Sequence, residues 1–307
     1  GGGNADPMEW AGAWRAAGAR SPRATASDSS TNPTITASAA RGGGALAARI
    51  AVVVSELSPG PDPEMIGIGI PGLVDPEAGT VRHAVNLGLD GTPFPLASVL
   101  RERLRTAVAV ENDVRTAALG AYRHVTRDRP EVSDTVYVGL GTGISAGVII
   151  GGRLHRGRHG IAGEIGHAPL GDTTTPCRCG LVGCLEAVAG GRALDERVPG
   201  GALGLFSDPE VESLRDRVAA ALARALYVLA TAYDPDILVL GGGIAVDAAP
   251  AVHEALLELS GSSPFGEEVL TVERVIALPP DADVGTTGAA LLEPPSATAE
   301  GRQGGNP

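Results

Sequence analysis

The pattern of apolar and polar residues alternates between helical and strand periods along most of the chain. Apolar side chains at three- and four-residue steps predict helices over Ala45–Leu57, Pro95–Arg105, Val211–Tyr233 and Ala248–Leu259. Short apolar runs beside glycine turns predict strands over Met65–Ile70, Val108–Val110, Asp134–Leu140, Ala146–Ile150 and Ile237–Leu240. Because strands alternate with helices, we expect an α/β fold.

Both ends of the chain depart from this pattern. Residues 1–32 are rich in Gly, Ala, Ser and Arg and do not begin with Met. They show no period beyond a short Ala/Trp stretch at Trp10–Ala17, so we expect a disordered segment, or one produced by a shifted frame or start site. The tail over residues 293–307 is rich in Pro, Gly and polar residues, which predicts a flexible segment.

The composition of the 307-residue chain excludes several classes of function. With 43% hydrophobic and 20% charged residues, the chain can form a globular core. Its formal charge of −12 disfavours nucleic acid as a partner, because phosphate binding requires clustered cations. All 24 basic residues are Arg, which excludes a Walker A lysine and a lysine Schiff base. No long apolar run and no secretory signal pattern are present, so we expect a cytoplasmic protein without a membrane partner.

Three cysteines gather within eight residues, which is a poor pattern for disulfides and a good one for a metal site. Together with His167, residues Cys177, Cys179 and Cys184 supply the donor set of a tetrahedral zinc site. Because these four ligands leave no open position, we expect the zinc to be structural. The alternative is three buried thiols and an unrelated histidine. Clustered thiols also favour a reducing compartment, which agrees with the cytoplasm.

A short polar triplet, Glu111-Asn112-Asp113, follows the predicted strand at Val108–Val110. A carboxylate at the end of a strand, beside a polar amide, can act as a general base on a hydroxyl group. An ordinary surface turn is the alternative interpretation of these three residues.

A second polar group contains Glu164, His167 and Glu186. Glu164 lies three residues before His167, so one helical turn would place both on the same face. Glu186 lies two residues after Cys184, so a zinc loop would also position this second carboxylate. Two carboxylates, an amide and an imidazole would suit a ligand with many hydroxyl groups.

Two glycine turns directly follow predicted strands. Gly141-Thr142-Gly143 presents backbone amides and one hydroxyl group, which suits a phosphate. Gly242 and Gly243 belong to a turn that opens a helix, which favours a phosphate or the close approach of a flat ring. Each turn can alternatively be a turn without a ligand.

Taken together, these segments are similar to one family. The matching text is IGIPGLVD at 68–75, VENDVRTAALGAY at 110–122, VGLGTGISAGVIIGGRL at 138–154, GIAGEIGHAPLG at 160–171, CRCGLVGCLEAVAGGRAL at 177–194 and PDILVLGGGIA at 235–245. They resemble the ROK family of sugar kinases and sugar-responsive repressors, over about residues 33–292. The combination of EIGH with CxCGxxGCxE is the most specific part of this resemblance.

The resemblance implies a two-domain α/β fold of the actin-like ATPase (ribonuclease H-like) type with a sugar cleft between the domains. We therefore expect a small N-terminal α/β domain over residues 33–125. A C-terminal α/β domain with the zinc loop is expected over residues 126–292. Dimers are common in the family, so a homodimer is an open expectation.

The resemblance also assigns roles to the residues singled out above. It implies a glucokinase-like enzyme that uses ATP with Mg²⁺ on a hexose or N-acetylhexosamine, with Asp113 as the general base. Implied sugar contacts are Gly72, Asn112, Glu164, His167 and Glu186. Implied nucleotide contacts are Gly141, Thr142, Gly143, Gly242 and Gly243. Implied ligands of a structural Zn²⁺ are His167, Cys177, Cys179 and Cys184.

The sequence departs from the family pattern in one important way. Family kinases begin with a strand that ends in Asp-x-Gly-Gly-Thr, the first phosphate loop, and this motif is absent here. We therefore expect the N-terminal strands to be missing or altered. In addition, Arg115 stands where the family has a small amide residue. The alternatives to a kinase are thus a non-catalytic sugar-binding ROK protein, a truncated or degenerate kinase that lacks the first phosphate loop, and a defective gene product that folds poorly. A repressor would carry a helix-turn-helix, for which residues 1–50 show no pattern.

Overall fold

The computed structural model describes residues 42–57, 63–198, 200–206, 209–262, 264–270, 274–279 and 281–294. The predicted loose segment over residues 1–32 lies outside the described residues, as does the tail from residue 295. The chain forms two units, and each is built from separate stretches of sequence. In the described part, unit 1 contains residues 132–146 and 164–282, and unit 2 contains residues 42–131, 147–163 and 283–294. The successive domains 33–125 and 126–292 stay a prediction.

Unit 2 is organised around a parallel pair of strands, β1 and β4. Its strands are β1 (Met65–Ile70), β2 (Leu73–Asp75), β3 (Thr80–Arg82), β4 (Ala107–Asn112) and β7 (Arg153–His155). Its helices are α2 (Gly43–Leu57), α3 (Leu96–Leu104), α4 (Asp113–Asp128) and α11 (Val284–Ala290), with a 3-10 turn η1 at Val85–Leu87. Strands β2 and β3 form an antiparallel hairpin. Among the described residues of unit 2, β1 pairs with β4 alone.

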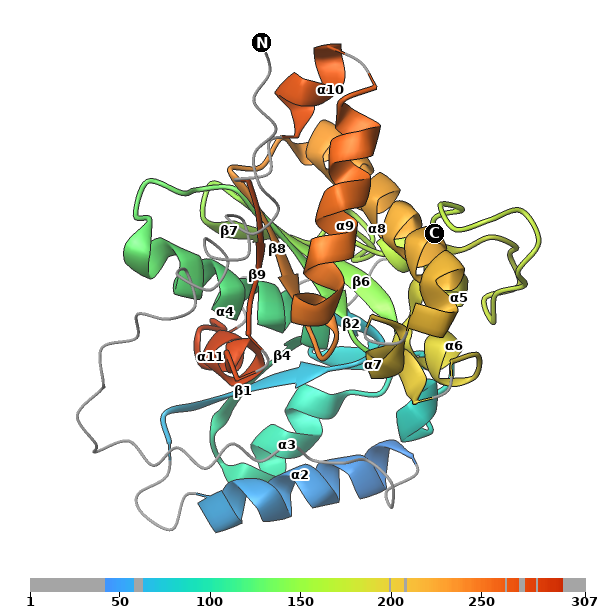
Figure 1. The fold of residues 1–307 in the computed structure, drawn as a ribbon. Coiled ribbons are helices and arrows are strands. Elements are labelled where there is room, and N and C mark those ends of the chain that lie inside the picture. The colour runs from blue at the N-terminus through green and yellow to red at the C-terminus, as the bar shows by residue number, and fades with distance from the viewer. Residues whose placement is uncertain are drawn as a thin grey trace, which may run out of the picture. The chain divides into compact units, whose positions relative to one another are not determined.

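The alternating glycines of β1 allow helices to approach one face of the strand closely. A strand points successive side chains to opposite faces, and Ile68 packs into the apolar core that α2 and α3 share. On the other face, a Cβ at Gly67 would overlap the carbonyl oxygen of Ala289 in α11. A Cβ at Gly69 would lie 3.1 Å from the side chain of Thr116 in α4. Helices α4 and α11 therefore pack directly against the glycine face of β1, and Figure 1 shows both helices on the same side of this strand.

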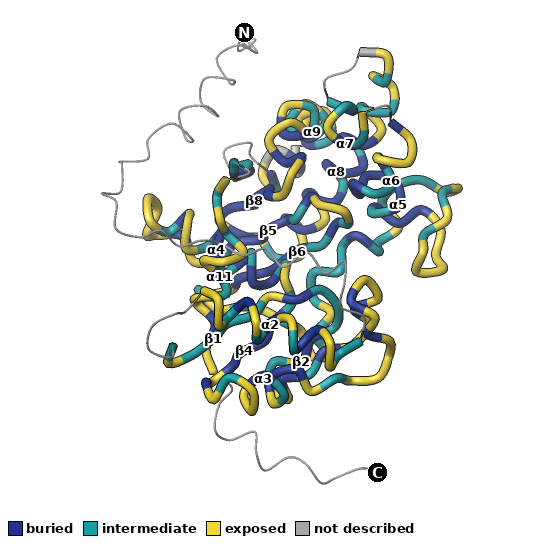
Figure 2. The backbone as a smooth tube through the Cα atoms, turned by 90° about the horizontal axis from the view of Figure 1, so that it is seen from below, coloured by how far each residue is buried: buried dark blue, intermediate teal, exposed yellow. Residues whose placement is uncertain are grey.

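Unit 1 is organised around the parallel strands β5, β8 and β9. Its strands are β5 (Thr135–Leu140), β8 (Ile237–Gly241) and β9 (Val275–Ala277), and the chain leaves this unit along β6 (Ile144–Ile150). The full sheet has the order β7-β6-β5-β8-β9, with β6 and β7 antiparallel. All five residues of β8 are buried, as the dark blue trace in Figure 2 shows.

The helices of unit 1 are mostly short, apart from α8 and α9. They are α5 (Leu185–Ala189), α6 (Gly191–Asp195), α7 (Gly201–Leu205), α8 (Glu212–Tyr233), α9 (Ala245–Ser260) and α10 (Pro264–Val269), with 3-10 turns η2 at Ile165–His167 and η3 at Pro209–Val211. The face of α8 that periodicity predicts is buried at Val218, Leu222, Ala225 and Leu229. Helix α8 packs against α9 and α5. None of the described helices combines the length and apolar character needed to span a membrane.

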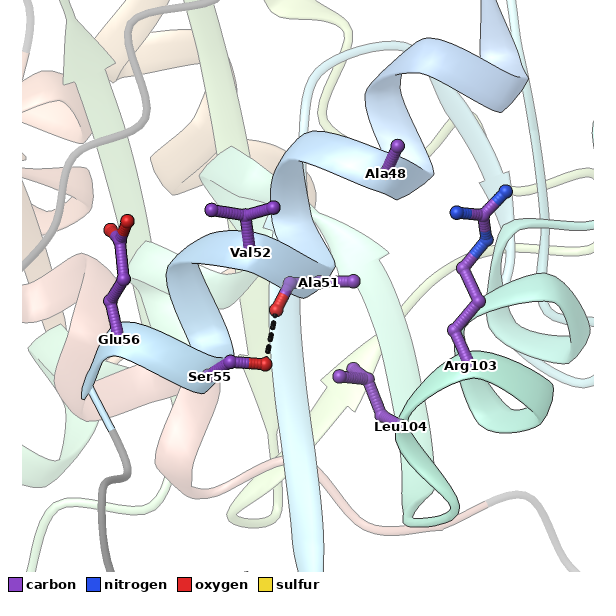
Figure 3. Close-up of a pocket in the computed structure, with 7 residues that line it drawn as sticks. All are labelled: Ala48, Ala51, Val52, Ser55, Glu56, Arg103 and Leu104. Atoms are coloured by element: carbon purple, nitrogen blue, oxygen red, sulfur yellow. Dashed lines mark hydrogen bonds between the residues drawn. The ribbon is translucent and has the colours of Figure 1, made fainter.

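The predicted elements are confirmed with small shifts of their ends. The four predicted helices are present as α2, α3, α8 and α9, and the five predicted strands as β1, β4, β5, β6 and β8. A hollow of about 500 Å³ lies on unit 2 between α2 and α3 (Figure 3). Val52, Glu56 and Arg103 are among its lining residues, and no predicted site residue lines it.

Candidate functional site

Asn112 joins the end of β4 to the start of α4. Its Oδ1 accepts hydrogen bonds from the backbone N–H groups of Val114 at 3.0 Å and Arg115 at 3.2 Å. These are donors that the first turn of a helix leaves unsatisfied, so Asn112 acts as the N-cap. Its Nδ2 donates to the carbonyl oxygen of Gly72 at 3.2 Å. An amide nitrogen has a second N–H, which can donate to a ligand.

Gly72 occupies the turn after β1, and its backbone requires glycine. Its φ is +105°, which side chains rarely adopt, and a Cβ there would lie 2.7 Å from the carbonyl oxygen of Arg82. The hydrogen bond from Asn112 therefore fixes this turn beside the start of α4.

Asp113 is the first residue of α4 and keeps an exposed surface. Its Oδ1 accepts a hydrogen bond from the backbone N–H of Val114 at 2.9 Å. Desolvation by the surrounding protein raises the pKa of this carboxyl above its ordinary value of 3.8, and the hydrogen bond from Val114 offsets part of that rise. A carboxylate with a raised pKa is a stronger base, as proton abstraction from a hydroxyl requires.

Glu111 points away from solvent and is fully buried. Its Oε2 accepts a hydrogen bond from Arg156 Nε at 2.6 Å, and its Oε1 accepts one from the backbone N–H of Asn112 at 2.8 Å. Arg115 Nη1 lies 3.5 Å from Glu111 Oε1, and Arg115 Nη2 donates to the carbonyl oxygen of Gly160. Glu111 is therefore a paired structural carboxylate, and Asp113 is the member of the triplet that can act as a base.

The two predicted glycine turns lie in unit 1 at the carboxyl ends of paired strands. Gly141-Thr142-Gly143 connects β5 to β6, and Gly242 and Gly243 follow β8. A Cβ at Gly242, whose φ is +101°, would overlap the carbonyl oxygen of the last residue of β5. Ligands of open α/β sheets bind at this edge, beyond the carboxyl ends of the strands.

Glu164, His167 and Glu186 all belong to unit 1, and all three are half-buried. The predicted turn is present, because the His167 N–H donates to the carbonyl oxygen of Glu164 at 3.1 Å. Glu186, on α5, accepts a hydrogen bond from the Ile144 N–H at 3.0 Å through Oε2. On the other side, a Cβ at Gly166 would overlap the carbonyl oxygen of Ile144. The structure thus brings Glu186 and the backbone of the turn from Glu164 to His167 to the same residue of β6.

The four predicted metal ligands meet in a single cluster. The ligand atoms of His167, Cys177, Cys179 and Cys184 all lie within 4.8 Å of one another. The Cys179 and Cys184 sulfurs are 3.6 Å apart, and Cys177 Sγ lies 3.9 Å from His167 Nδ1. A disulfide would require about 2.05 Å, whereas a tetrahedron with bonds of about 2.3 Å has edges of about 3.8 Å. The geometry and the donor set therefore fit a tetrahedral metal ion.

The thiols of this cluster differ in their acidity. Burial raises the pKa of Cys184 to about 12, and its thiol donates to the carbonyl oxygen of His167 at 3.4 Å. A backbone hydrogen bond from Leu181 lowers the pKa of Cys179 to about 7. A bound cation favours the thiolate form of both residues.

The sequence-predicted residues thus fall into two groups. Gly72, Asn112 and Asp113 meet in unit 2. The two glycine turns, the carboxylates Glu164 and Glu186, and the cysteine–histidine cluster belong to unit 1.

Comparison with known families identifies one that matches most of the chain. A model of the ROK family matches residues 44–294. The chain belongs to the ROK family. A glucokinase from Thermotoga maritima is 34% identical to this ROK chain over 270 residues, which cover 80% of this chain and 83% of that enzyme. A xylose repressor from Caldicellulosiruptor bescii is 40% identical over 129 residues, which cover 42% of this chain but only 31% of the repressor.

Solved ROK structures share the fold of this chain. The crystal structure of a ROK family glucokinase from Streptomyces griseus, in complex with glucose and AMPPNP, aligns with a TM-score of 0.67 and 29% identity. The alignment covers 82% of this chain and 88% of that chain. The prediction of an α/β fold of the actin-like ATPase type is confirmed.

Two features of the ROK chain were not predicted from its sequence. One is the pairing of Glu111 with Arg156, and the other is the hydrogen bond between the Ile144 N–H and Glu186. A glutamate at the end of an otherwise apolar strand signals a buried carboxylate that requires a cation, but the sequence spacing points to Arg115 and not to Arg156. The second involves a backbone group, which leaves no signal in the sequence.

Proposed function

We propose that this ROK protein is a sugar kinase that transfers the γ-phosphoryl group of ATP, with Mg²⁺, to a hexose or an N-acetylhexosamine. The observation that carries the proposal is Asp113, an accessible carboxylate of raised pKa at the junction of β4 and α4. It occurs in a chain that is 34% identical to a glucokinase over 80% of its length.

In the proposed reaction, the carboxylate of Asp113 takes the proton from a sugar hydroxyl. The hydroxyl oxygen forms a bond to the γ-phosphorus as the bond from that phosphorus to the β–γ bridging oxygen breaks. The products are a sugar phosphate, ADP and a protonated Asp113. When bound with ATP, Mg²⁺ would neutralise phosphate charge, and phosphoryl transfer depends on this neutralisation and on positioning.

The remaining predicted residues have binding roles in this proposal. We assign contacts with the sugar hydroxyl groups to Asn112 and the backbone at Gly72 in unit 2, and to Glu164, His167 and Glu186 in unit 1. Carboxylates accept hydrogen bonds from hydroxyl groups, and amides both donate and accept them. The phosphates lie on Gly141, Thr142 and Gly143, and the adenosine lies beside Gly242 and Gly243.

We also propose that the metal ion of the cysteine–histidine cluster is zinc and that its role is structural. Three thiolates and one imidazole complete a tetrahedron, which leaves no position for a substrate. Cys184 is the N-cap residue of α5, the helix that carries Glu186. The ion would therefore hold in place the residues that present this carboxylate.

The experiment is ADP release from ATP across a panel of hexoses and N-acetylhexosamines, with the wild type, Asp113→Asn and Asp128→Asn. Asp128 is the exposed last residue of the same helix, so Asp128→Asn is a matched control. We expect Asp113→Asn to lose turnover by at least about 100-fold and to keep its sugar affinity, and the control to keep both. Retained turnover in Asp113→Asn contradicts the role of this residue.

A second candidate is a sugar-binding protein without kinase activity. The observation that favours it is the absence of the Asp-x-Gly-Gly-Thr motif, because ATP would lack one phosphate loop. The same panel separates the two functions. Sugar binding without ADP release in a folded sample supports the binding protein and contradicts the kinase.

A further inference from the structure

Glu186 is in direct contact with the glycine turn between β5 and β6. Its Oε2 accepts a hydrogen bond from the N–H of Ile144, the residue that follows the turn, at 3.0 Å. Gly143 leaves the space for this carboxylate, because a Cβ at Gly143 would overlap Glu186 Oε2. The side chain that the proposed function assigns to the sugar is thus packed on the turn that it assigns to the phosphates.

A second connection joins the same two segments through their backbones. The N–H of Gly191 donates to the carbonyl oxygen of Gly141 at 2.9 Å, and the N–H of Arg192 donates to that of Thr142 at 3.0 Å. These donors belong to the first residues of α6, which directly follows the helix of Glu186. A displacement of the turn would therefore strain three hydrogen bonds to residues 186–192.

We propose that Gly143 and Ile144 are positioning residues for Glu186, and that they couple sugar binding to nucleotide binding. One carboxylate oxygen stays on the turn, which orients the other toward a sugar hydroxyl. A phosphate that orders the turn then also orders Glu186, which raises the affinity for the sugar. By linkage, a bound sugar raises the affinity for the nucleotide by the same factor. This inference rests on the proposed sugar-binding role of Glu186.

Two alanine substitutions in the same turn test the inference. Neither Gly141 nor Gly143 has a positive φ, so alanine fits the backbone at both positions. A Cβ at Gly141 meets open space, whereas one at Gly143 meets the far end of the Glu186 side chain. Gly143→Ala therefore moves a flexible carboxylate without disturbing backbone packing, and Gly141→Ala is its matched control.

The measurement is the dissociation constant of the preferred sugar by calorimetry, in the absence of any nucleotide. We expect Gly143→Ala to weaken sugar binding by about 10- to 100-fold, the effect of losing a hydrogen bond to a charged group. Gly141→Ala should bind sugar within about twofold of the wild type. A purely nucleotide-binding turn predicts no change in either variant.

The outcomes separate this inference from the proposed function. Sugar binding by the wild type with equal affinity in Gly143→Ala overturns the inference and leaves the proposed function intact. Absence of sugar binding in a folded wild type contradicts both.

A second variant covers the case in which Gly143→Ala does not fold. Glu186→Asp withdraws the carboxylate from the Ile144 N–H without touching the turn. For the wild type, a saturating sugar should raise the affinity for a non-hydrolysable ATP analogue. In Glu186→Asp this gain should disappear, and a gain that persists overturns the coupling.

Discussion

At the residue scale, the surroundings of two neighbouring carboxylates decide which of them can act as a base. Glu111 and Asp113 are two residues apart, yet one is buried against Arg156 and the other keeps an exposed surface at the start of a helix. Pairing consumes the hydrogen-bonding capacity of Glu111, whereas desolvation makes Asp113 more basic. Of these two acidic residues, Glu111 is therefore structural and Asp113 is the candidate base.

The raised pKa of Asp113 predicts a specific pH dependence. A general base is active when deprotonated, so activity is retained above the pKa and is lost as the pH falls through it. Because desolvation raises this pKa, we expect the acid limb of kcat/KM above the ordinary value of 3.8. The measurement is kcat/KM against pH, with circular dichroism at each pH to establish that the protein is folded. An acid limb at or below 3.8 contradicts the expectation.

Replacement of Arg156 predicts a loss of stability. Arg156→Ala leaves Glu111 with Arg115 as its remaining cation, at 3.5 Å. We expect the free energy of unfolding in urea to fall by about 1–3 kcal/mol, because a buried carboxylate loses a charged donor. The matched control is Arg178→Ala, whose pair with Glu196 is exposed by 72% and 65% and should be worth less than about 1 kcal/mol. Equal losses in the two variants would show that the burial of Glu111 does not matter.

At the element scale, α4 illustrates what the sequence can and cannot predict. Periodicity predicted four helices and five strands correctly, because each has an apolar face. It did not predict α4, whose buried positions include Arg115, Thr116 and Gly120. None of these residues counts as apolar in a periodicity pattern. The buried guanidinium group of Arg115 contacts Glu111 and the carbonyl oxygen of Gly160. The N-cap Asn112 was the local signal for this helix.

The N-cap of α4 predicts different losses of stability for two substitutions at Asn112. Asn112→Ala removes the acceptor for two backbone N–H groups and the donor to Gly72, so we expect a loss of about 1–2 kcal/mol. Asn112→Asp keeps the capping oxygen and should recover most of that loss. Urea unfolding of both variants provides the measurement. If Asn112→Asp is as unstable as Asn112→Ala, the capping contribution is negligible.

At the scale of the whole molecule, the candidate site was predicted from sequence as a set of residues. Motif spacing sufficed for the metal cluster, because its ligands are held by one loop and one turn. Motif spacing did not predict the contact between Glu186 and Ile144, because that contact depends on how β6 packs beside α5. The division of each unit into separate stretches also follows from packing and has no counterpart in local composition.

Metal content is the prediction that concerns the molecule as a whole. We expect about one zinc per chain, and a chelator should lower the melting temperature, because such sites contribute on the order of 10 kcal/mol to local folding. Cys184→Ser should lose zinc, whereas Arg178→Ala, an exposed residue between two ligands, should keep it. A folded wild type without zinc contradicts the assignment of the metal.

The position of α11 has a consequence for the way this protein is made. Helix α11 packs against β1 and α4 through close contacts, since a Cβ at Gly120 would overlap the carbonyl oxygen of Val284. The ribosome completes β1 and α4 long before α11, with nearly all of unit 1 synthesised in between. Helix α4 can cover Gly69 early, but the part of the glycine face around Gly67, which α11 covers, stays exposed until the last part of the chain emerges. A nascent chain that terminates before Val284 would keep this part of β1 exposed to water and to other proteins.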